Sequence, residues 1–249
     1  MAIVRFGCRC IRDRGLGLMA ARPISPDLVI VVADADAEQF LRALLQRGID
    51  RKCLRPIHYL VRRDPMRDAS VLRNPARSLV DIPRRGCRVL VTFDHHGSGK
   101  ENEAPQTLAE SVLSELERAG FSRESTRCVL FEPELEATLV TVWSSVQGIL
   151  EAKRGKKVDS SKILAGTKAL RPAVASTPSE GALAELLKNQ PKECLIELLH
   201  ALQLRHQPAL FKELGTNLSM GALKAGEVAR RIAEILVDWF GIREVVGTG

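Results

Sequence analysis

The chain has 249 residues, of which 45% are hydrophobic and 27% are charged. These proportions are typical of a folded globular protein, and they exclude a disordered chain, a collagen-like repeat and a small disulfide-rich scaffold. Lys and Arg number 37 against 30 for Asp and Glu, giving a formal net charge of +7 that favours a polyanionic partner.

Cysteine usage and the N-terminal segment bear on where the protein works. The six cysteines are scattered, and the closest pair, Cys8 and Cys10, lacks the two intervening residues of a zinc knuckle. We therefore expect a reduced, cytoplasmic protein. No run of about 18 apolar residues is present, so we expect no membrane span. Residues 1–26 show no clean period and end in Pro23 and Pro26, which predicts an N-terminal arm or extension.

From residue 27 onward, short β-branched runs alternate with segments of helical period. Strands are predicted at Leu28–Ala33, Pro56–Val61, Cys87–Phe93 and Cys128–Phe131. Helices are predicted at Glu38–Arg47, Asp68–Asp81, Thr107–Ala119 and Leu135–Ala152. This alternation predicts an α/β domain over residues 27–152, with a mostly parallel sheet that carries helices on both faces. The first and third strands are expected to be the most deeply buried.

The last part of the chain changes character. Residues 153–178 begin with a basic run, Lys153–Lys157, and continue as a polar segment rich in Ser, Thr, Ala and Pro, which is typical of a linker. Residues 179–249 have helical period and predict a small C-terminal helical subdomain. Its helices are predicted at residues 179–188, 191–204 and 225–240, with a further helical turn at 208–214.

Acidic side chains follow three of the four predicted strands. Asp34 and Asp36 come after the first strand, Asp94 after the third, and Glu134 and Glu136 after the fourth. In an open parallel sheet, ligands bind at the edge where the strands end. Acids grouped there repel one another unless a cation neutralises them, and carboxylate oxygens suit Mg²⁺ or Mn²⁺. All five are therefore predicted metal ligands, and all but Asp36 are predicted to be catalytic.

Helix capping is the alternative interpretation of the same acids, because Asp at an N-cap and Glu in a first turn both stabilise a helix. Asp94 is the strongest candidate ligand, since the polar, Gly-rich segment 95–101 exceeds what a cap requires. Within that segment, His95 and His96 are candidate proton shuttles or metal ligands, and simple solvation is their alternative.

Basic side chains near the same edge are candidates for phosphate contact. They are Lys100, after the third strand, and Arg62 and Arg63, after the second. Solvated side chains are the alternative. A nucleotide-binding P-loop is excluded, because Asp94 stands where that motif needs Gly, and Glu101 stands where it needs Ser or Thr.

Six segments in a fixed order carry a family resemblance. The first three are Val32-Ala-Asp34, Phe93-Asp-His-His-Gly-Ser-Gly-Lys-Glu101 and Glu132-Pro-Glu-Leu-Glu-Ala137, the last with Trp143 in the helix that follows. The other three are Gln190-Pro-Lys-Glu193, His206-Gln-Pro-Ala-Leu-Phe211 and Asp238-Trp-Phe240. Over residues 27 to 240 the chain resembles the TOPRIM-like proteins of bacterial methylation-associated anti-phage defence systems, the Mad family.

This resemblance implies a TOPRIM-like fold and Mg²⁺-dependent chemistry on the phosphodiesters of DNA or RNA. It also implies other proteins of the defence system as partners. The sequence departs from the general TOPRIM pattern at Asp34, where Glu is usual, and at His96, where the second Asp of a DxD pair would stand. A non-enzymatic adaptor that binds partner proteins through its helical tail is therefore an alternative.

A second, weaker resemblance is to the DHH phosphoesterases. It rests on Asp34-Ala-Asp36 after one strand and Asp94-His95-His96 after another. It implies two Mn²⁺ ions held by Asp and His, with a bridging hydroxide as the nucleophile. The further His and Asp of that family are missing at the expected spacing.

Overall fold

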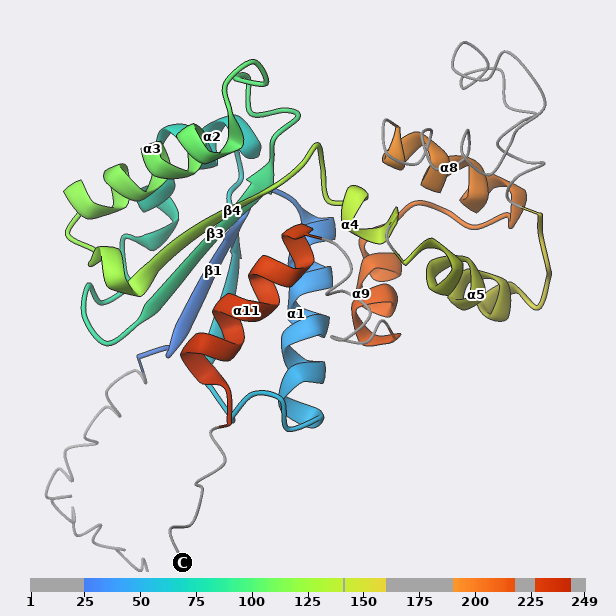
Figure 1. The fold of residues 1–249 in the computed structure, drawn as a ribbon, viewed down its shortest axis with the longest axis horizontal. Helices are drawn as coiled ribbons and strands as arrows, with labels where there is room; N and C mark the ends of the chain where they lie inside the picture. The colour runs from blue at the N-terminus through green and yellow to red at the C-terminus, as the bar shows by residue number, and fades with distance from the viewer. Residues whose placement is uncertain (1–24, 141, 160–189, 218–226, 243–249) are drawn as a thin grey trace, which may run out of the picture.

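The computed structural model describes residues 25–140, 142–159, 190–217 and 227–242. The predicted helix at 179–188 and most of the predicted arm and linker lie outside these residues. Figure 1 shows a twisted sheet with helices on both faces, and further helices to the right of α1 (Ala35–Asp50) in this view. None of the described helices is long and apolar enough to cross a membrane.

Four strands form one parallel sheet in the order β2-β1-β3-β4. Their bounds are Leu28–Val32 for β1, Tyr59–Arg63 for β2, Arg88–Asp94 for β3 and Thr126–Phe131 for β4. The two central strands are β1 and β3, and every residue of β1 is fully buried. Central parallel strands are covered on both faces, which explains their almost continuous apolar sequences. The predicted α/β fold with a parallel sheet is confirmed.

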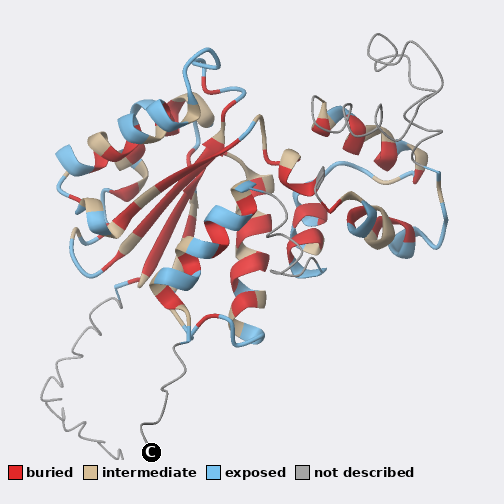
Figure 2. Ribbon diagram, in the orientation of Figure 1, coloured by how far each residue is buried: buried red, intermediate tan, exposed pale blue. Residues whose placement is uncertain are grey.

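The two faces of the sheet are covered by different helices. Side chains of β1 alternate, so Val29 and Val31 pack with α2 (Asp68–Arg73) and α3 (Pro105–Arg118). Leu28, Ile30 and Val32 pack with α1 (Ala35–Asp50) and α11 (Glu227–Phe240) on the other face. Figure 2 shows the buried strands between these exposed outer helix surfaces.

The C-terminal helices share one apolar core with α1 and the sheet. They are α4 (Ala137–Val140), α5 (Trp143–Arg154), α8 (Pro191–Ala201) and α9 (Pro208–Asn217), followed by α11. Helix α9 lies against α1 at Gly215, where an added Cβ would come within 2.6 Å of the Phe40 carbonyl oxygen. The absence of a side chain at Gly215 therefore sets how closely α9 approaches α1.

Three predicted elements differ in the structure, and one of them is the predicted helix Leu135–Ala152, which is divided into α4 and α5. The second strand begins at Tyr59 and ends at Arg63, so Arg62 and Arg63 belong to the strand and Asp64 follows it. The prediction that no acid follows this strand was wrong. The predicted helix Asp68–Asp81 is divided into α2 and a 3-10 helix at Pro75–Leu79, because the residue before a proline disfavours the α conformation.

Candidate metal centre

A cavity of about 830 Å³ opens at the carboxyl ends of the strands. Acidic residues from four different segments line it: Asp34, Asp36, Asp64, Asp68, Asp94 and Glu134. The cavity thus collects acids that follow all four strands, as a parallel sheet does when its strands end at one edge. The structure brings four of the five predicted ligands to its wall, and the fifth, Glu136, lies next to Glu134.

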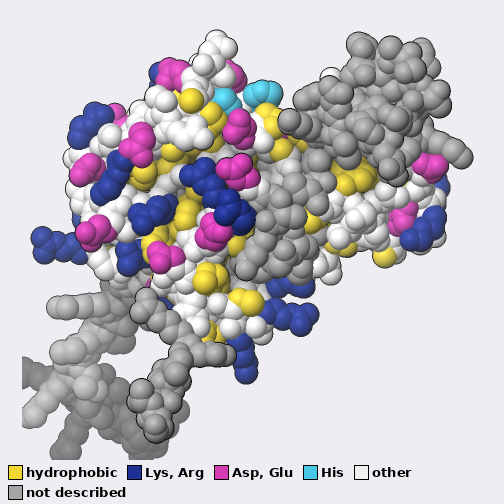
Figure 3. Space-filling view, in the orientation of Figure 1, with side chains coloured by type: hydrophobic (Ala, Val, Ile, Leu, Met, Phe, Trp, Pro, Cys, Tyr) yellow, Lys and Arg dark blue, Asp and Glu magenta, His cyan; other side chains and the backbone are white. Residues whose placement is uncertain are grey.

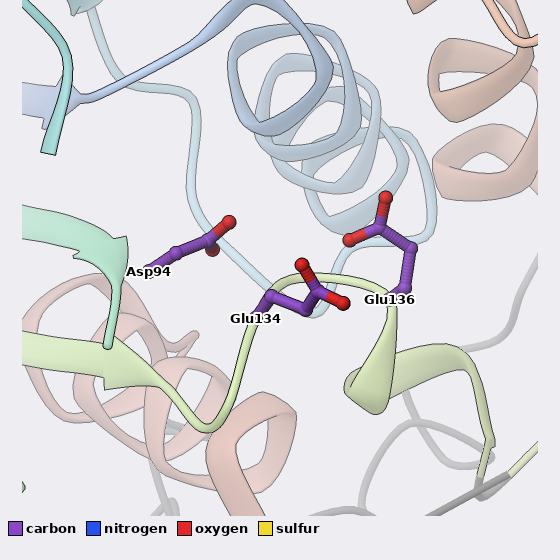
Figure 4. A group of neighbouring side chains, drawn as sticks. All are labelled: Asp94, Glu134 and Glu136. Atoms are coloured by element: carbon purple, nitrogen blue, oxygen red, sulfur yellow. The ribbon is translucent and has the colours of Figure 1, made fainter. Parts of the chain in front are cut away.

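Asp94, Glu134 and Glu136 form the tightest acidic group. Each offers one carboxylate oxygen, and these three oxygens lie within 4.8 Å of one another. Figure 4 shows their side chains projecting from the ends of β3 and β4 into the space next to α1. Around Mg²⁺, ligands at about 2.1 Å lie about 3 to 4 Å from one another, so separations of up to 4.8 Å would have to shrink by about 1 to 2 Å when the ion binds. The group fits a small divalent cation.

The loop after β4 is tied to the end of β3. The backbone N–H of Leu135 donates to Asp94 Oδ1 at 3.0 Å, which places Glu134 and Glu136 on either side of that bond. The backbone N–H of Asp94 donates to Asp68 Oδ1 at 2.9 Å, so α2 is also attached to this strand end. Backbone hydrogen bonds therefore position the carboxylates before any cation is bound.

Burial and the repulsion between neighbouring carboxylates raise the pKa values of Asp94, Glu134 and Asp68. Burial is the largest cause of the rise in the pKa of Asp94 to about 9, and the neighbouring charges of Asp68, Asp34, Glu136 and Glu134 add to it. Burial also raises the pKa of Glu134, with Glu136 contributing, and the pKa of Asp68. A cation that neutralises the cluster would therefore stabilise the ionised carboxylates.

Two basic side chains from the C-terminal part of the chain, Lys192 and His206, face the cluster. Lys192 Nζ, at the start of α8, lies 3.7 Å from Glu134 Oε2. His206 Nε2, just before α9, lies 3.6 Å from Glu136 Oε1 and 3.7 Å from Asp36 Oδ2. Burial would lower the pKa of Lys192, but Glu136, Glu134 and other nearby acids raise it overall. The hydrogen bond with Glu136 is the largest cause of the raised His206 pKa.

The first strand contributes two acids with different surroundings. Asp34 is the N-cap of α1, and its Oδ1 accepts the backbone N–H of Ala37 at 2.8 Å. It lines the cavity as well, so the capping and ligand interpretations of Asp34 are compatible in the structure. Burial is the main cause that raises the pKa of Asp36 to about 6, while His206 opposes the rise.

In the segment after Asp94, the two candidate histidines have different surroundings. His95 is 9% exposed, and its Nε2 donates to the carbonyl oxygen of Glu103 at 3.0 Å. His96 lines the cavity, whereas His95 does not. Lys100 also lies outside the cavity wall, and its Nζ is 2.7 Å from Glu103 Oε1. Only His96 of these three side chains borders the acidic cavity.

The two arginines of β2 that were predicted to contact phosphate also have different surroundings. Arg62 lies outside the cavity wall, and its Nη2 donates to Asp81 Oδ2 at 2.7 Å. Arg63 lines the cavity, together with Arg67 from the loop before α2. Successive residues of a strand point to opposite faces, which accounts for the different environments of Arg62 and Arg63.

Sequence reasoning did not single out Asp68, Lys192 or His206 as site residues. Asp68 carries a signal that could have identified it, because it follows a strand end by a few residues, as the other acids do. Lys192 and His206 lie in segments noted for the family resemblance, but no local pattern places them beside the strand ends. Asp64 is 1% exposed and accepts hydrogen bonds from Met66 and Ser78, so its carboxylate is held in the loop.

Comparison with known proteins gives two structural likenesses. No protein-family model and no curated protein matches the chain. The C-terminal region of the Burkholderia pseudomallei OLD protein gives a TM-score of 0.42 at 14% identity, covering 86% of this chain and 98% of that chain. The C-terminal region of the Xanthomonas campestris pv. campestris OLD protein gives 0.37 at 11% identity, covering 86% and 97%. At these TM-scores the likeness assigns neither a family nor an activity to the chain.

Proposed function

We propose that the protein is a TOPRIM-like, divalent-metal-dependent phosphodiesterase that acts on nucleic acid. The meeting of Asp94, Glu134 and Glu136 at the carboxyl edge of a parallel sheet carries this proposal. These three side chains would hold Mg²⁺ or Mn²⁺, with Asp34 and Asp36 at the same wall. The formal net charge of +7 supports a polyanionic substrate.

The remaining cavity residues supply what a phosphodiester requires. A bound divalent cation would act as a Lewis acid and lower the pKa of a bound water. Lys192, Arg63 and Arg67 would bind phosphate oxygens, since all three line the same cavity as the carboxylates. His96, which is exposed and lines the cavity, would be the proton shuttle between the site and solvent.

An adaptor role is less well supported by the surface of the helices. Among the described residues, the exposed large hydrophobic side chains are Met66, Val80, Val237 and Ile242. Only Val237 belongs to a C-terminal helix, so α8, α9 and α11 present no broad apolar face for a partner protein. The convergent carboxylates favour the enzyme over the adaptor.

The DHH-type alternative requires histidine ligands beside Asp94. The His95 ring donates to a backbone carbonyl and lies outside the cavity wall, so of the two histidines in that motif only His96 borders the cavity. A carboxylate set that suits Mg²⁺ is therefore the better supported of the two metal sites. The anti-phage defence role and the partner proteins of that system rest on the family resemblance, the cytoplasmic location rests on the scattered cysteines, and all three remain part of this proposal.

Nuclease assays on the purified protein test the proposal. Plasmid DNA, single-stranded DNA and RNA are incubated with Mg²⁺, with Mn²⁺ or with EDTA. We expect metal-dependent cleavage that Asp94→Asn and Glu136→Gln each reduce by about a hundredfold or more. Glu117→Gln, a matched change at an exposed position of α3, should keep full activity. A folded wild-type protein that cleaves no substrate, or an Asp94→Asn variant as active as wild type, would overturn the proposal.

A further inference from the structure

A second cavity, of about 470 Å³, lies along α1 between the edge strand β2 and α9. Four basic side chains and one acidic side chain line it: Arg42, Arg47, Arg51, Lys212 and Asp50. On the part of the surface that Figure 3 shows in colour, basic and acidic side chains are interleaved. Basic groups thus predominate among the charged side chains that line this cavity, which we call the α1 groove.

The α1 groove and the metal centre belong to the same helix. Asp36, in the first turn of α1, lines the acidic cavity, whereas the groove-lining residues of α1 recur every three or four positions from Gln39 onward. Residues at this spacing share one face of a helix. At 1.5 Å per residue, Arg51 lies about 22 Å from Asp36 along the helix axis. One helix face thus runs from the acidic cavity to a basic groove.

The basic residues of the groove have two different roles. Arg42 Nη2 donates to the carbonyl oxygen of Val61 at 2.7 Å, and Arg47 donates to the carbonyl oxygen of Thr216. These two contacts join α1 to β2 and to α9, so they build the walls. Arg51 and Lys212 are exposed, and neither forms an ion pair with another residue in the described ranges. Their charges are available to an anion.

We propose that the α1 groove binds the phosphodiester backbone of the nucleic acid, with Arg51 and Lys212 contacting its phosphates. This inference rests on the proposed function and specifies its substrate as a polynucleotide that extends beyond the metal centre. A length of about 22 Å corresponds to about six base pairs of duplex at 3.4 Å per pair. The groove lies toward the C-terminal end of α1, where the helix dipole repels anions. A polynucleotide backbone carries single phosphates that are spaced apart and can each contact a separate basic side chain. A triphosphate would instead concentrate its negative charge at this end of the helix dipole, where it is repelled more strongly.

Binding measurements on a charge-removal variant test the groove. Arg51→Ala/Lys212→Ala is compared with wild type and with Arg85→Ala/Arg118→Ala, a control that removes two exposed charges from the loop before β3 and from α3. The probes are fluorescein-labelled duplex DNA, single-stranded DNA and RNA, each longer than the groove, and an ATP analogue. Affinity is measured in EDTA over a range of salt concentrations.

The expected result is a change in salt dependence. For at least one polynucleotide, the plot of log affinity against log salt should become shallower by about 2 for the groove variant, while the control keeps the wild-type slope. The probe with the changed slope identifies the type of nucleic acid. An unchanged slope for all three polynucleotides would overturn the inference, as would a loss of affinity confined to the ATP analogue.

The metal centre is assessed separately, by hydrolysis of bis(p-nitrophenyl) phosphate by the wild-type protein with Mg²⁺ or Mn²⁺. This diester is too small to reach the groove. Hydrolysis together with an unchanged salt slope would refute the groove alone. A groove-dependent slope without cleavage of any diester would contradict the proposed function and support the groove as a nucleic-acid binding site.

Discussion

Lys192 Nζ lies 3.7 Å from Glu134 Oε2, so the first turn of α8 places an ammonium group against the loop that follows β4. The side chain of Glu134 is 13% exposed and that of Lys192 is 44% exposed. The nearby acids raise the pKa of Lys192, which keeps it charged at neutral pH. A residue from the C-terminal helices thus offsets part of the negative charge of a cluster built on the sheet.

Removing this ammonium group should affect both stability and activity. For Lys192→Ala in EDTA, we expect the free energy of unfolding to fall by about 1 kcal/mol, a modest loss because solvent screens a half-exposed pair. Mg²⁺ should restore much of this loss by neutralising the same carboxylates. Cleavage should fall by about a hundredfold or more, because a donor to the phosphate is missing. Thermal melting and initial rates check both parts, and a fully active variant would exclude a role in phosphate binding.

Asp94→Asn should separate metal binding from loop stability. The amide oxygen can still accept the N–H of Leu135, and the amide stays uncharged at the high pH where an ionised Asp94 is repelled by Asp68, Asp34 and the two glutamates. We therefore expect the melting temperature in EDTA to stay the same or to rise. The further increase that Mg²⁺ or Mn²⁺ produces in the wild type should disappear. If Asp94 acts only as a structural acceptor, metal ions should shift both melting temperatures equally.

The metal-free protein should become less stable as the pH rises. In the folded state the pKa of Asp94 is about 9, against an ordinary value of 3.8, so between these values the folded state holds a proton that the unfolded chain releases. The contribution of Asp94 to stability is thus complete below about pH 3.8 and is lost as the pH approaches 9. Asp36, with a pKa of about 6, acts in the same direction over a narrower range.

Chemical denaturation in EDTA between about pH 6 and about pH 9 measures this slope. Asp94→Asn should show a flatter profile than the wild type. Stabilisation by Mg²⁺ should grow with pH, because metal binding displaces the proton. Wild-type stability that rises toward pH 9 in EDTA would contradict the raised pKa of this carboxyl.

Gly215 should be intolerant of a side chain. An added Cβ would lie 2.6 Å from the Phe40 carbonyl oxygen and 2.9 Å from the Ala43 Cβ, so α9 would have to move away from α1. We expect Gly215→Ala to lower the free energy of unfolding by about 1 to 3 kcal/mol. Gly148→Ala on α5 is the matched control, because nothing lies within 4 Å of its added Cβ and alanine favours a helix. Equal stability of the two variants in urea would contradict the close contact.

The sheet could be predicted because its signal is local. The run beginning at Leu28 is apolar throughout, and the run beginning at Cys87 is apolar except for Arg88 and Thr92; both are central strands of the sheet. The second strand was placed too early, since its predicted start, Pro56, lacks the N–H that a strand interior donates. Its actual end, Arg62-Arg63, is charged, as suits a strand at the edge of the sheet.

The site could be predicted only in part. An acid that directly follows a strand must lie at the edge where that strand ends. The positions of Asp34, Asp94 and Glu134 could therefore be predicted from the sequence. Lys192 and His206 reach the same cavity through the packing of α8 and α9 against segments far away in the chain. Such packing depends on complementary side-chain shapes across the core, which no local periodicity encodes.

Calorimetric titration with Mn²⁺ tests the central claim most directly, because it measures metal binding without requiring a substrate. The wild type, Asp94→Asn, Glu136→Gln and the exposed control Glu117→Gln are titrated at the same pH. We predict saturable binding to the wild type and to the control, and affinity reduced by about tenfold or more in the other two. Equal affinity in all four proteins, or no binding to a folded wild type, would contradict a metal centre formed by Asp94, Glu134 and Glu136.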